Sequence, residues 1–150
     1  RRVRNGVYAW GYGVWDKETR RRGVGAVVRA GEETREVSLA LPPADPAPPH
    51  KLFESWFAHL EALLAVLRSL PPEQRGKTLV YNCGLGGPMF NGLGARCYVK
   101  DDSPVAPLHA EVSRLLRPFP RFILGLNPGA RERALELAAL ALNLPPDRFR

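Results

Sequence analysis

Three short segments near the start of the chain carry patterns typical of β-strands, and the third of them alternates hydrophobic and polar residues. Strands are predicted at residues 7–15, 23–28 and 35–41, where aromatic and β-branched residues are frequent. Polar turns at residues 16–20 and 30–33 separate these segments. Because antiparallel strands can be joined by connections this short, the pattern predicts an antiparallel meander.

After the third segment the pattern changes to the period of an α-helix. The proline-rich stretch 42–49 is predicted to be an extended connector, since proline fits neither a helix interior nor a central strand. A helix is predicted at residues 50–70 and ends at Pro71 and Pro72. Its large apolar residues share one face. They are Leu52, Phe53, Trp56, Phe57, Leu60, Leu63, Leu64 and Leu67.

The second half of the chain alternates strand and helix patterns. Strands are predicted at residues 77–82 and 121–126, and helices at 104–116 and 129–142. The stretch 83–94 is rich in glycine, which weakens any helix there.

The expected order is β-β-β-α-β-α-α-β-α. A meander followed by crossover units indicates a mixed five-stranded sheet, antiparallel in its first half and parallel afterwards, flanked by helices. We therefore expect an α/β (α+β) fold, and we expect residues 1–150 to form a single domain of ordinary size.

The charge balance favours anionic partners. The chain has 22 Lys and Arg against 15 Asp and Glu, a net charge of +7 at pH 7, and nucleic acid is the first partner to consider for such a surplus. Coding bias or a heat-adapted host also explains arginine-rich, proline-rich composition. The densest basic clusters are Arg20, Arg21 and Arg22, which follow the aromatic residues Tyr12 and Trp15, and the N-terminal arginines at positions 1, 2 and 4.

Cysteine usage and hydropathy bear on three properties: metal binding, cellular compartment and membrane insertion. Cys83 and Cys97 form no C-x-x-C pair and have no neighbouring histidine cluster, so no zinc site or other metal site is predicted. Two reduced thiols fit a cytoplasmic protein. No apolar run has the length of a membrane span, and no signal peptide is visible. No cofactor is indicated by any motif.

Several stretches in this order resemble the ribonuclease H family. Tyr-Ala-Trp-Gly-Tyr at 8–12 and Gly-Val-Gly-Ala-Val-Val at 23–28 resemble its first hairpin. The stretch 62–68 resembles its first long helix, and Leu-Val-Tyr-Asn at 79–82 stands where the family has a strand ending in Asp-Ser. Further similar stretches are residues 90–93, 98–102, 107–112 and 126–138. The resemblance covers nearly the whole chain and implies the ribonuclease H-like fold.

The resemblance also implies where catalytic acids would stand. The family's acids fall on Trp10, Asn82 and Leu135, and its helix acid falls on His59 or, counted from the helix start, on Glu54. Helix geometry favours His59, which borders the sheet-facing stripe, whereas Glu54 points roughly opposite. A histidine at such a place is more often a buried imidazole than a metal ligand.

Neutral side chains at these positions argue against the family's reaction. Two divalent cations about 4 Å apart need converging anionic oxygens to offset their charge, and Mg²⁺ binds through carboxylates. We therefore expect a catalytically degenerate domain that does not cleave RNA in an RNA–DNA hybrid. The alternative is an active enzyme with relocated acids, yet the remaining acids form no convergent set. They are Asp16 and Glu18 in a turn expected to be solvated, Asp101, Asp102, Glu111, Glu132 and Glu136.

Two non-catalytic roles stay open. A nucleic-acid-binding domain would use Arg20, Arg21 and Arg22 on phosphates, with Tyr12 or Trp15 stacking on bases or sugars, although such residues also occur as a solvated hairpin tip and core aromatics. A protein-interaction module or homodimer would use the apolar cleft left by the missing acids. Another enzyme class is weakly indicated, because Gly-Leu-Gly-Gly at 84–87 lacks phosphate-loop spacing and no G-x-S-x-G occurs.

Overall fold

One mixed sheet organises the molecule. The computed structural model describes residues 6–42, 51–82, 106–125 and 127–150. Its strands are β1 Gly6–Trp15, β2 Arg22–Ala30, β3 Glu33–Leu41, β4 Thr78–Asn82 and β5 Phe122–Gly125. They lie in the order β3-β2-β1-β4-β5. The first three strands pair antiparallel, and β4 and β5 run parallel to β1, so the predicted mixed five-stranded sheet is confirmed.

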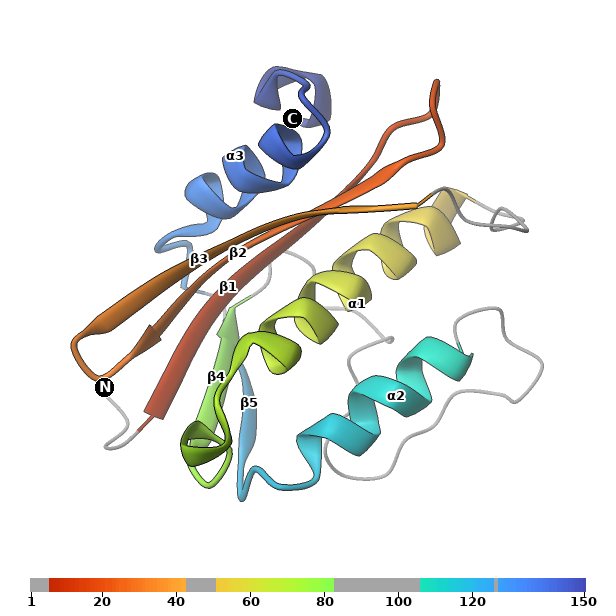
Figure 1. Ribbon diagram of the computed structural model, residues 1–150. Helices are drawn as coiled ribbons and strands as arrows, with labels where there is room; N and C mark the ends of the chain where they lie inside the picture. The colour runs from red at the N-terminus through yellow and green to blue at the C-terminus, as the bar shows by residue number, and fades with distance from the viewer. Residues whose placement is uncertain (1–5, 43–50, 83–105, 126) are drawn as a thin grey trace.

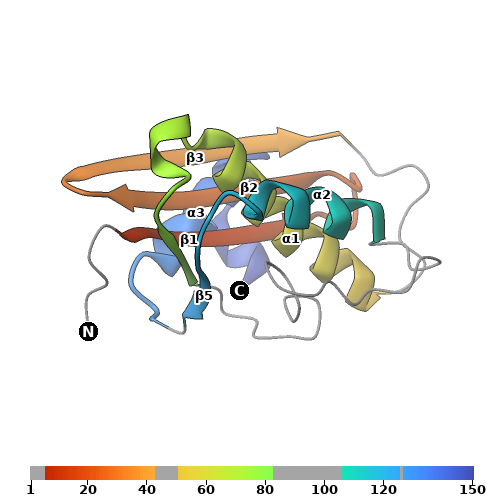
Figure 2. The same cartoon turned by 90° about the horizontal axis from the view of Figure 1, so that it is seen from below.

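Helices cover both faces of this sheet. Figure 1 shows α3 (Arg131–Ala141) on one face and α1 (Lys51–Ser69) on the other, with α2 (Ala106–Leu116) beside α1. The view from below shows α1 and α2 in one layer in front of the strands (Figure 2). Short 3₁₀ turns at Pro72–Gln74 and Pro146–Phe149 follow α1 and α3.

Alternation along β1 divides the core between the two faces. Val7 and Ala9 are fully buried on the α1 face, together with apolar residues of α1, β4 and α2. Trp10 and Val14 are buried on the α3 face, against Leu137 and Leu135 respectively. Because every second side chain of a strand points the same way, β1 contributes to both hydrophobic layers and is the central strand of the fold.

A close helix approach sets the α3 layer. A β-carbon added at Gly25 would stand 2.1 Å from the carbonyl oxygen of Ala134 and 2.4 Å from the amide nitrogen of Ala138. Only hydrogen fits between β2 and α3 at this point, since such distances are far below van der Waals contact. The glycine therefore allows α3 to lie directly on the strand.

The predicted elements agree with the structure apart from their ends. The helix expected at 104–116 is described from Ala106 onward, because residues 104 and 105 lie outside the described residues, and the last helix begins at Arg131 rather than at residue 129. An additional helix expected between the strand at 77–82 and that helix falls within residues 83–105, which lie outside the described residues. In the described part of the chain, no helix combines the length and hydropathy needed to cross a membrane.

Candidate functional site

The parallel strands β4 and β5 end side by side next to the middle of β1. Asn82, the last residue of β4, pairs with Trp10 on one side and with Gly125 of β5 on the other. Beyond Trp10, β1 continues to Trp15 with no described strand on that side. Ligands of sheets with parallel strands commonly bind outside such carboxyl ends, so this edge is the natural candidate site.

A hydrogen-bonded network occupies this edge. The Asn82 side chain is buried, donates from Nδ2 to the Ala9 carbonyl oxygen at 3.3 Å, and accepts from the Asn127 backbone N–H at 3.2 Å. The indole Nε1–H of Trp10 donates to the Asn127 carbonyl oxygen at 3.0 Å. Asn127, between β5 and α3, is thus held from both sides by the two positions where the family resemblance places acids.

The Trp10 ring fills the space beneath the start of α3. It is 4% exposed and packs with Val27 and Leu137. Gly129 has φ +26°, and a β-carbon added there would lie 2.5 Å from Trp10 Nε1. The backbone before α3 therefore rests on the indole, and glycine is needed there both for its φ and for the close contact.

His59 is buried on α1 beside the same strand. Its ring meets Tyr12 edge-on, with 5.1 Å between ring centroids. The Nδ1 atom is buried without a hydrogen-bond partner. Burial lowers the pKa of His59 from 6.5 to about 4, because desolvation disfavours the imidazolium. The imidazole is therefore neutral at physiological pH.

Leu135, on α3, is the last of the four positions at which the family resemblance places an acid. It is buried in a cluster with Val14, Ala138 and Leu142, against which Tyr12 also packs. The structure thus places Trp10 and Asn82 side by side, and it places His59 and Leu135 around Tyr12, two residues further along β1. These positions present an indole, an amide, a neutral imidazole and an alkyl chain.

The carboxylates that the structure describes are placed elsewhere. Among the described residues, no three His, Cys, Asp or Glu side chains lie close enough together to hold a metal ion. The side chain of Glu54 and the residues Asp101 and Asp102 lie outside the described part of the chain.

Asp16 corrects one expectation. It was expected to be solvated in its turn, yet it is 2% exposed, accepts a hydrogen bond from Thr19 Oγ1 at 2.6 Å and pairs with Arg148 at 2.7 Å. These contacts hold the pKa of Asp16 below its usual value, although burial acts in the opposite direction. Asp16 therefore ties the hairpin to the C-terminal 3₁₀ turn.

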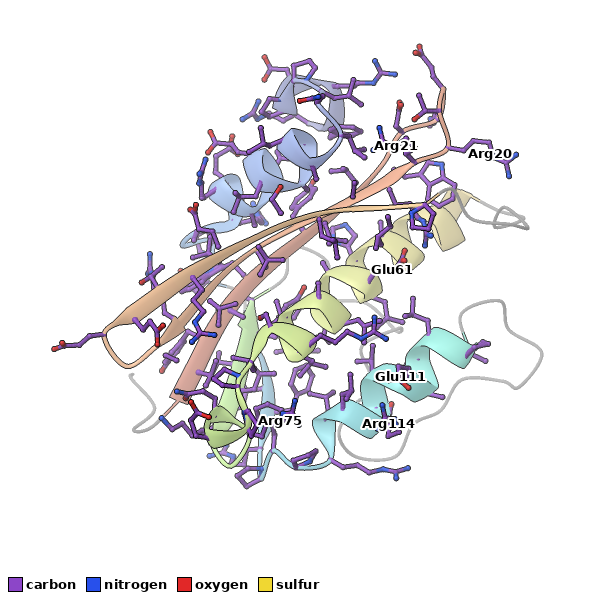
Figure 3. All side chains as sticks on the ribbon, viewed as in Figure 1. Arg20, Arg21, Glu61, Arg75, Glu111 and Arg114 are labelled. Carbon is purple, nitrogen blue, oxygen red and sulfur yellow. The ribbon has the colours of Figure 1, made fainter. Side chains whose placement is uncertain are left out.

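The three consecutive arginines at the β1–β2 hairpin differ in environment. Arg20 is exposed and Arg21 half-buried, at the hairpin end of the molecule (Figure 3). Arg22 is not part of a solvated tip. Its guanidinium pairs with Glu61 of α1, donates to the Pro42 carbonyl oxygen at 2.8 Å and lies 5.8 Å from the centroid of the half-buried Trp15 ring. Burial raises the pKa of Glu61 to about 6, and Arg22 opposes that rise.

Two residues of this region escaped the sequence patterns. Asn127 bridges Trp10 and Asn82 through its backbone, and a backbone contact leaves no side-chain signature beyond the turn-forming Asn-Pro-Gly at 127–129. Arg29 lies with its guanidinium carbon 4.9 Å from the centroid of the Trp10 ring. Only the pairing of β1 with β2, in which Arg29 faces Tyr8, brings this arginine to the site.

Comparisons with known proteins agree on the architecture. No protein-family profile and no curated protein sequence matches the chain. Among solved structures, RNase H1 from the halophilic archaeon Halobacterium salinarum NRC-1 superposes with a TM-score of 0.70 at 20% identity, covering 92% of this chain and 98% of that one.

Two further solved structures superpose over similar lengths. LC11-RNase H1, isolated from compost by a metagenomic approach, has a TM-score of 0.70 at 16% identity and covers 93% of this chain and 96% of its own. The N-terminal RNase H domain of a Mycobacterium tuberculosis protein, solved as a fusion with maltose-binding protein, has a TM-score of 0.63 at 18% identity and covers 92% and 94%. Together with the strand order and pairing described above, these matches establish that the chain has the ribonuclease H-like fold.

Proposed function

We propose that this chain is a catalytically degenerate ribonuclease H-like domain that binds nucleic acid without cleaving it. The observation that carries the proposal is the network at the candidate site. Trp10 and Asn82 make three hydrogen bonds to backbone groups, two to Asn127 and one to Ala9. Side chains committed to neighbouring backbone groups in this way have a structural role where the resemblance places metal ligands.

The electrostatics of the site support the absence of a two-metal mechanism. Two divalent cations need several anionic oxygens, and Mg²⁺ in particular prefers carboxylates. Trp10 and Leu135 supply no oxygen, Asn82 supplies a neutral one, and His59 is an imidazole suited to other metals. The relocated-acid alternative depends on side chains outside the described residues, chiefly Glu54, Asp101 and Asp102, since Asp16 is already paired with Arg148.

Charge and fold together favour nucleic acid as the partner. The net charge is +7, and contacts between arginine and phosphate need no metal ion. The three superposed proteins are each described as RNase H, which makes nucleic acid the first ligand to test on this fold. Arg20 and Arg21 are the hairpin arginines that could reach it, because the guanidinium of Arg22 is largely enclosed by Glu61 and Pro42.

A combined binding and cleavage assay tests the proposal. A fluorescein-labelled RNA–DNA hybrid, RNA and single-stranded DNA are titrated with the protein at several salt concentrations, and the same mixtures are then supplied with Mg²⁺ or Mn²⁺. We expect binding with a negative slope of log affinity against log salt, weakened when Arg20 and Arg21 are replaced by Gln, and no cleavage. Arg75→Gln, at the opposite end of the molecule (Figure 3), is the matched control.

The outcomes separate the alternatives. Metal-dependent cleavage that disappears in Asn82→Ala would refute the proposal of a degenerate domain. Cleavage that survives Asn82→Ala but disappears in Glu54→Gln or Asp101→Asn would support relocated acids. Absence of binding to all three nucleic acids at low salt would remove the binding role.

A protein-interaction role is the second candidate. Leu39 on the edge strand β3 is 45% exposed and lines an open groove of about 390 Å³ between β3 and α1, and exposed apolar residues at a sheet edge are suited to a protein partner or a second copy. Light scattering discriminates the two roles, because a stable dimer without nucleic-acid affinity supports this one. A cytoplasmic location stays a prediction.

A further inference from the structure

Arg29, on β2 beside Trp10, is an arginine with no carboxylate partner among the described residues. Its side chain is exposed on β2, with the guanidinium over the face of the Trp10 ring. Arg22, Arg133 and Arg148 are each paired with a carboxylate. Within the described residues, Arg29 has neither an ion pair nor a side-chain hydrogen bond. Its positive charge is therefore available to a ligand.

Two carboxylates of β3 and α3 are paired with other arginines. Thr34 stands directly opposite Arg29 on β3, and Glu36, two residues further along that strand, pairs with Arg133 at 2.8 Å. Glu132, in the first turn of α3, pairs with Arg150. Neither Glu36 nor Glu132 is therefore paired with Arg29, and no ion pair of Arg29 is found in the described part of the chain.

The indole positions this guanidinium. Trp10 is fixed by its hydrogen bond to Asn127 and by the backbone at Gly129, and it offers no free surface for stacking on a base because it is buried. A guanidinium over an aromatic face keeps its N–H edges free to donate to a pair of acceptor oxygens. Phosphate oxygens are the acceptors that arginine binds in bidentate geometry.

We infer that Arg29, held on Trp10, binds a phosphodiester of the nucleic-acid strand directly beside the degenerate centre. The inference rests on the proposed nucleic-acid-binding function and adds to it the group recognised at this site. In a two-metal enzyme, cations held by carboxylates meet the phosphate. Here a protein cation on an indole meets it, and no metal is required.

Variants of Arg29 test this contact. Binding of the labelled hybrid is measured over a range of salt for wild type, Arg29→Gln, Arg29→Lys and Arg75→Gln, with the melting temperature of each recorded. We expect Arg29→Gln to weaken binding about tenfold and to reduce the salt slope by about one. Arg29→Lys keeps the slope but binds more weakly, since a bidentate contact is lost. Arg75→Gln behaves as wild type.

A second arm identifies the phosphate source. A hybrid whose phosphates are replaced by neutral methylphosphonates should lose the Arg29-dependent part of the affinity. Inorganic phosphate should not displace the unmodified hybrid at concentrations too low to weaken the other contacts between the protein and the phosphates of the hybrid. Arg29-dependent binding of inorganic phosphate without binding of the hybrid would overturn the inference.

Failure of the inference is distinguishable from failure of the proposed function. If Arg29→Gln binds like wild type while the double Arg20→Gln and Arg21→Gln variant binds weakly, Arg29 has only a packing role and the proposed function stands. A change in melting temperature without a change in affinity or salt slope has the same meaning. If wild type itself does not bind, both the inference and the proposed function are refuted.

Discussion

An amide and a carboxylate have nearly the same shape, yet at position 82 an amide donates a hydrogen bond to a carbonyl oxygen and a carboxylate would repel it. The Asn82 amide nitrogen donates to the Ala9 carbonyl oxygen, and its oxygen accepts from Asn127. A carboxylate keeps the second bond but turns the first into a contact between two acceptors in a buried place. The network around this side chain is therefore specific for asparagine.

Asn82→Asp should accordingly destabilise the fold at neutral pH. We expect a loss of about 1–3 kcal/mol in the free energy of unfolding, measured by urea denaturation at pH 7. Burial raises the pKa of the introduced acid, so the loss should shrink as the pH falls and the protonated acid donates to Ala9 again. Asn127→Asp, on an exposed side chain that accepts from the Gly129 N–H, is the control and should change stability little. Wild-type stability of the Asn82→Asp variant at pH 7 would show that the network is incidental.

The buried His59 makes the free energy of unfolding depend on pH, and the sign of this dependence follows from its lowered pKa. Its pKa is about 4 in the folded chain against 6.5 when exposed, so between these values the unfolded state binds the proton more readily. The stabilisation is complete above pH 6.5 and is lost as the pH falls toward 4. It amounts to roughly 3 kcal/mol at 1.36 kcal/mol per pKa unit.

The comparison with His59→Gln isolates this contribution. Glu61, with its pKa raised from 4.5 to about 6, acts in the opposite direction, because its folded state holds the proton more tightly between these values. Both proteins contain Glu61, so the difference between their unfolding free energies cancels its effect. That difference should shift in favour of the variant as the pH falls from 6.5 to 4. A constant difference would mean that His59 is not buried neutral.

At the scale of single residues, the local sequence predicts site positions but gives no sign of their partners. The positions Trp10, His59, Asn82 and Leu135 follow from local motif register. Asp16 pairs with Arg148, 132 residues away, and a turn residue gives no local sign of such a partner. The solvation predicted for Asp16 was wrong for this reason.

At the scale of elements, β1 and β2 accept helices on both faces because small residues occur where helices cross. Gly25→Ala would place a methyl group 2.1 Å from the Ala134 carbonyl oxygen. We expect α3 to be displaced and the melting temperature to fall, with a loss of about 1–3 kcal/mol or more. Gly76→Ala, where no atom lies within 4 Å of the added carbon, is the matched control and should be nearly neutral. Equal effects of the two substitutions would refute the close approach of α3 to β2.

The elements themselves could be predicted because their patterns are local. An uninterrupted run of small and apolar residues marks β2, and an apolar stripe marks α1. The start of the last helix was less accurate, since Gly129 is compatible with a helix start but α3 begins two residues later, at Arg131. The strand order β3-β2-β1-β4-β5 depends on contacts between distant segments, and local periodicity does not predict it.

At the scale of the whole molecule, the proposed function combines two features: the hydrogen-bonded side chains of Trp10 and Asn82 at the end of β4, which are neutral, and a chain with a net charge of +7. Such a distribution favours phosphate contacts from arginine and opposes the capture of divalent cations. The two properties are separable by measurement, because one depends on salt and the other on metal concentration.

Titration with Mn²⁺, followed by electron paramagnetic resonance, tests the central claim most directly. Coordination by protein carboxylates removes the signal of the free ion, so bound metal is counted without reliance on activity. We predict that the signal with protein present equals that of buffer, and that protein and hybrid together bind no more Mn²⁺ than the hybrid alone. Uptake of two equivalents of Mn²⁺ that disappears in Asn82→Ala would contradict the account.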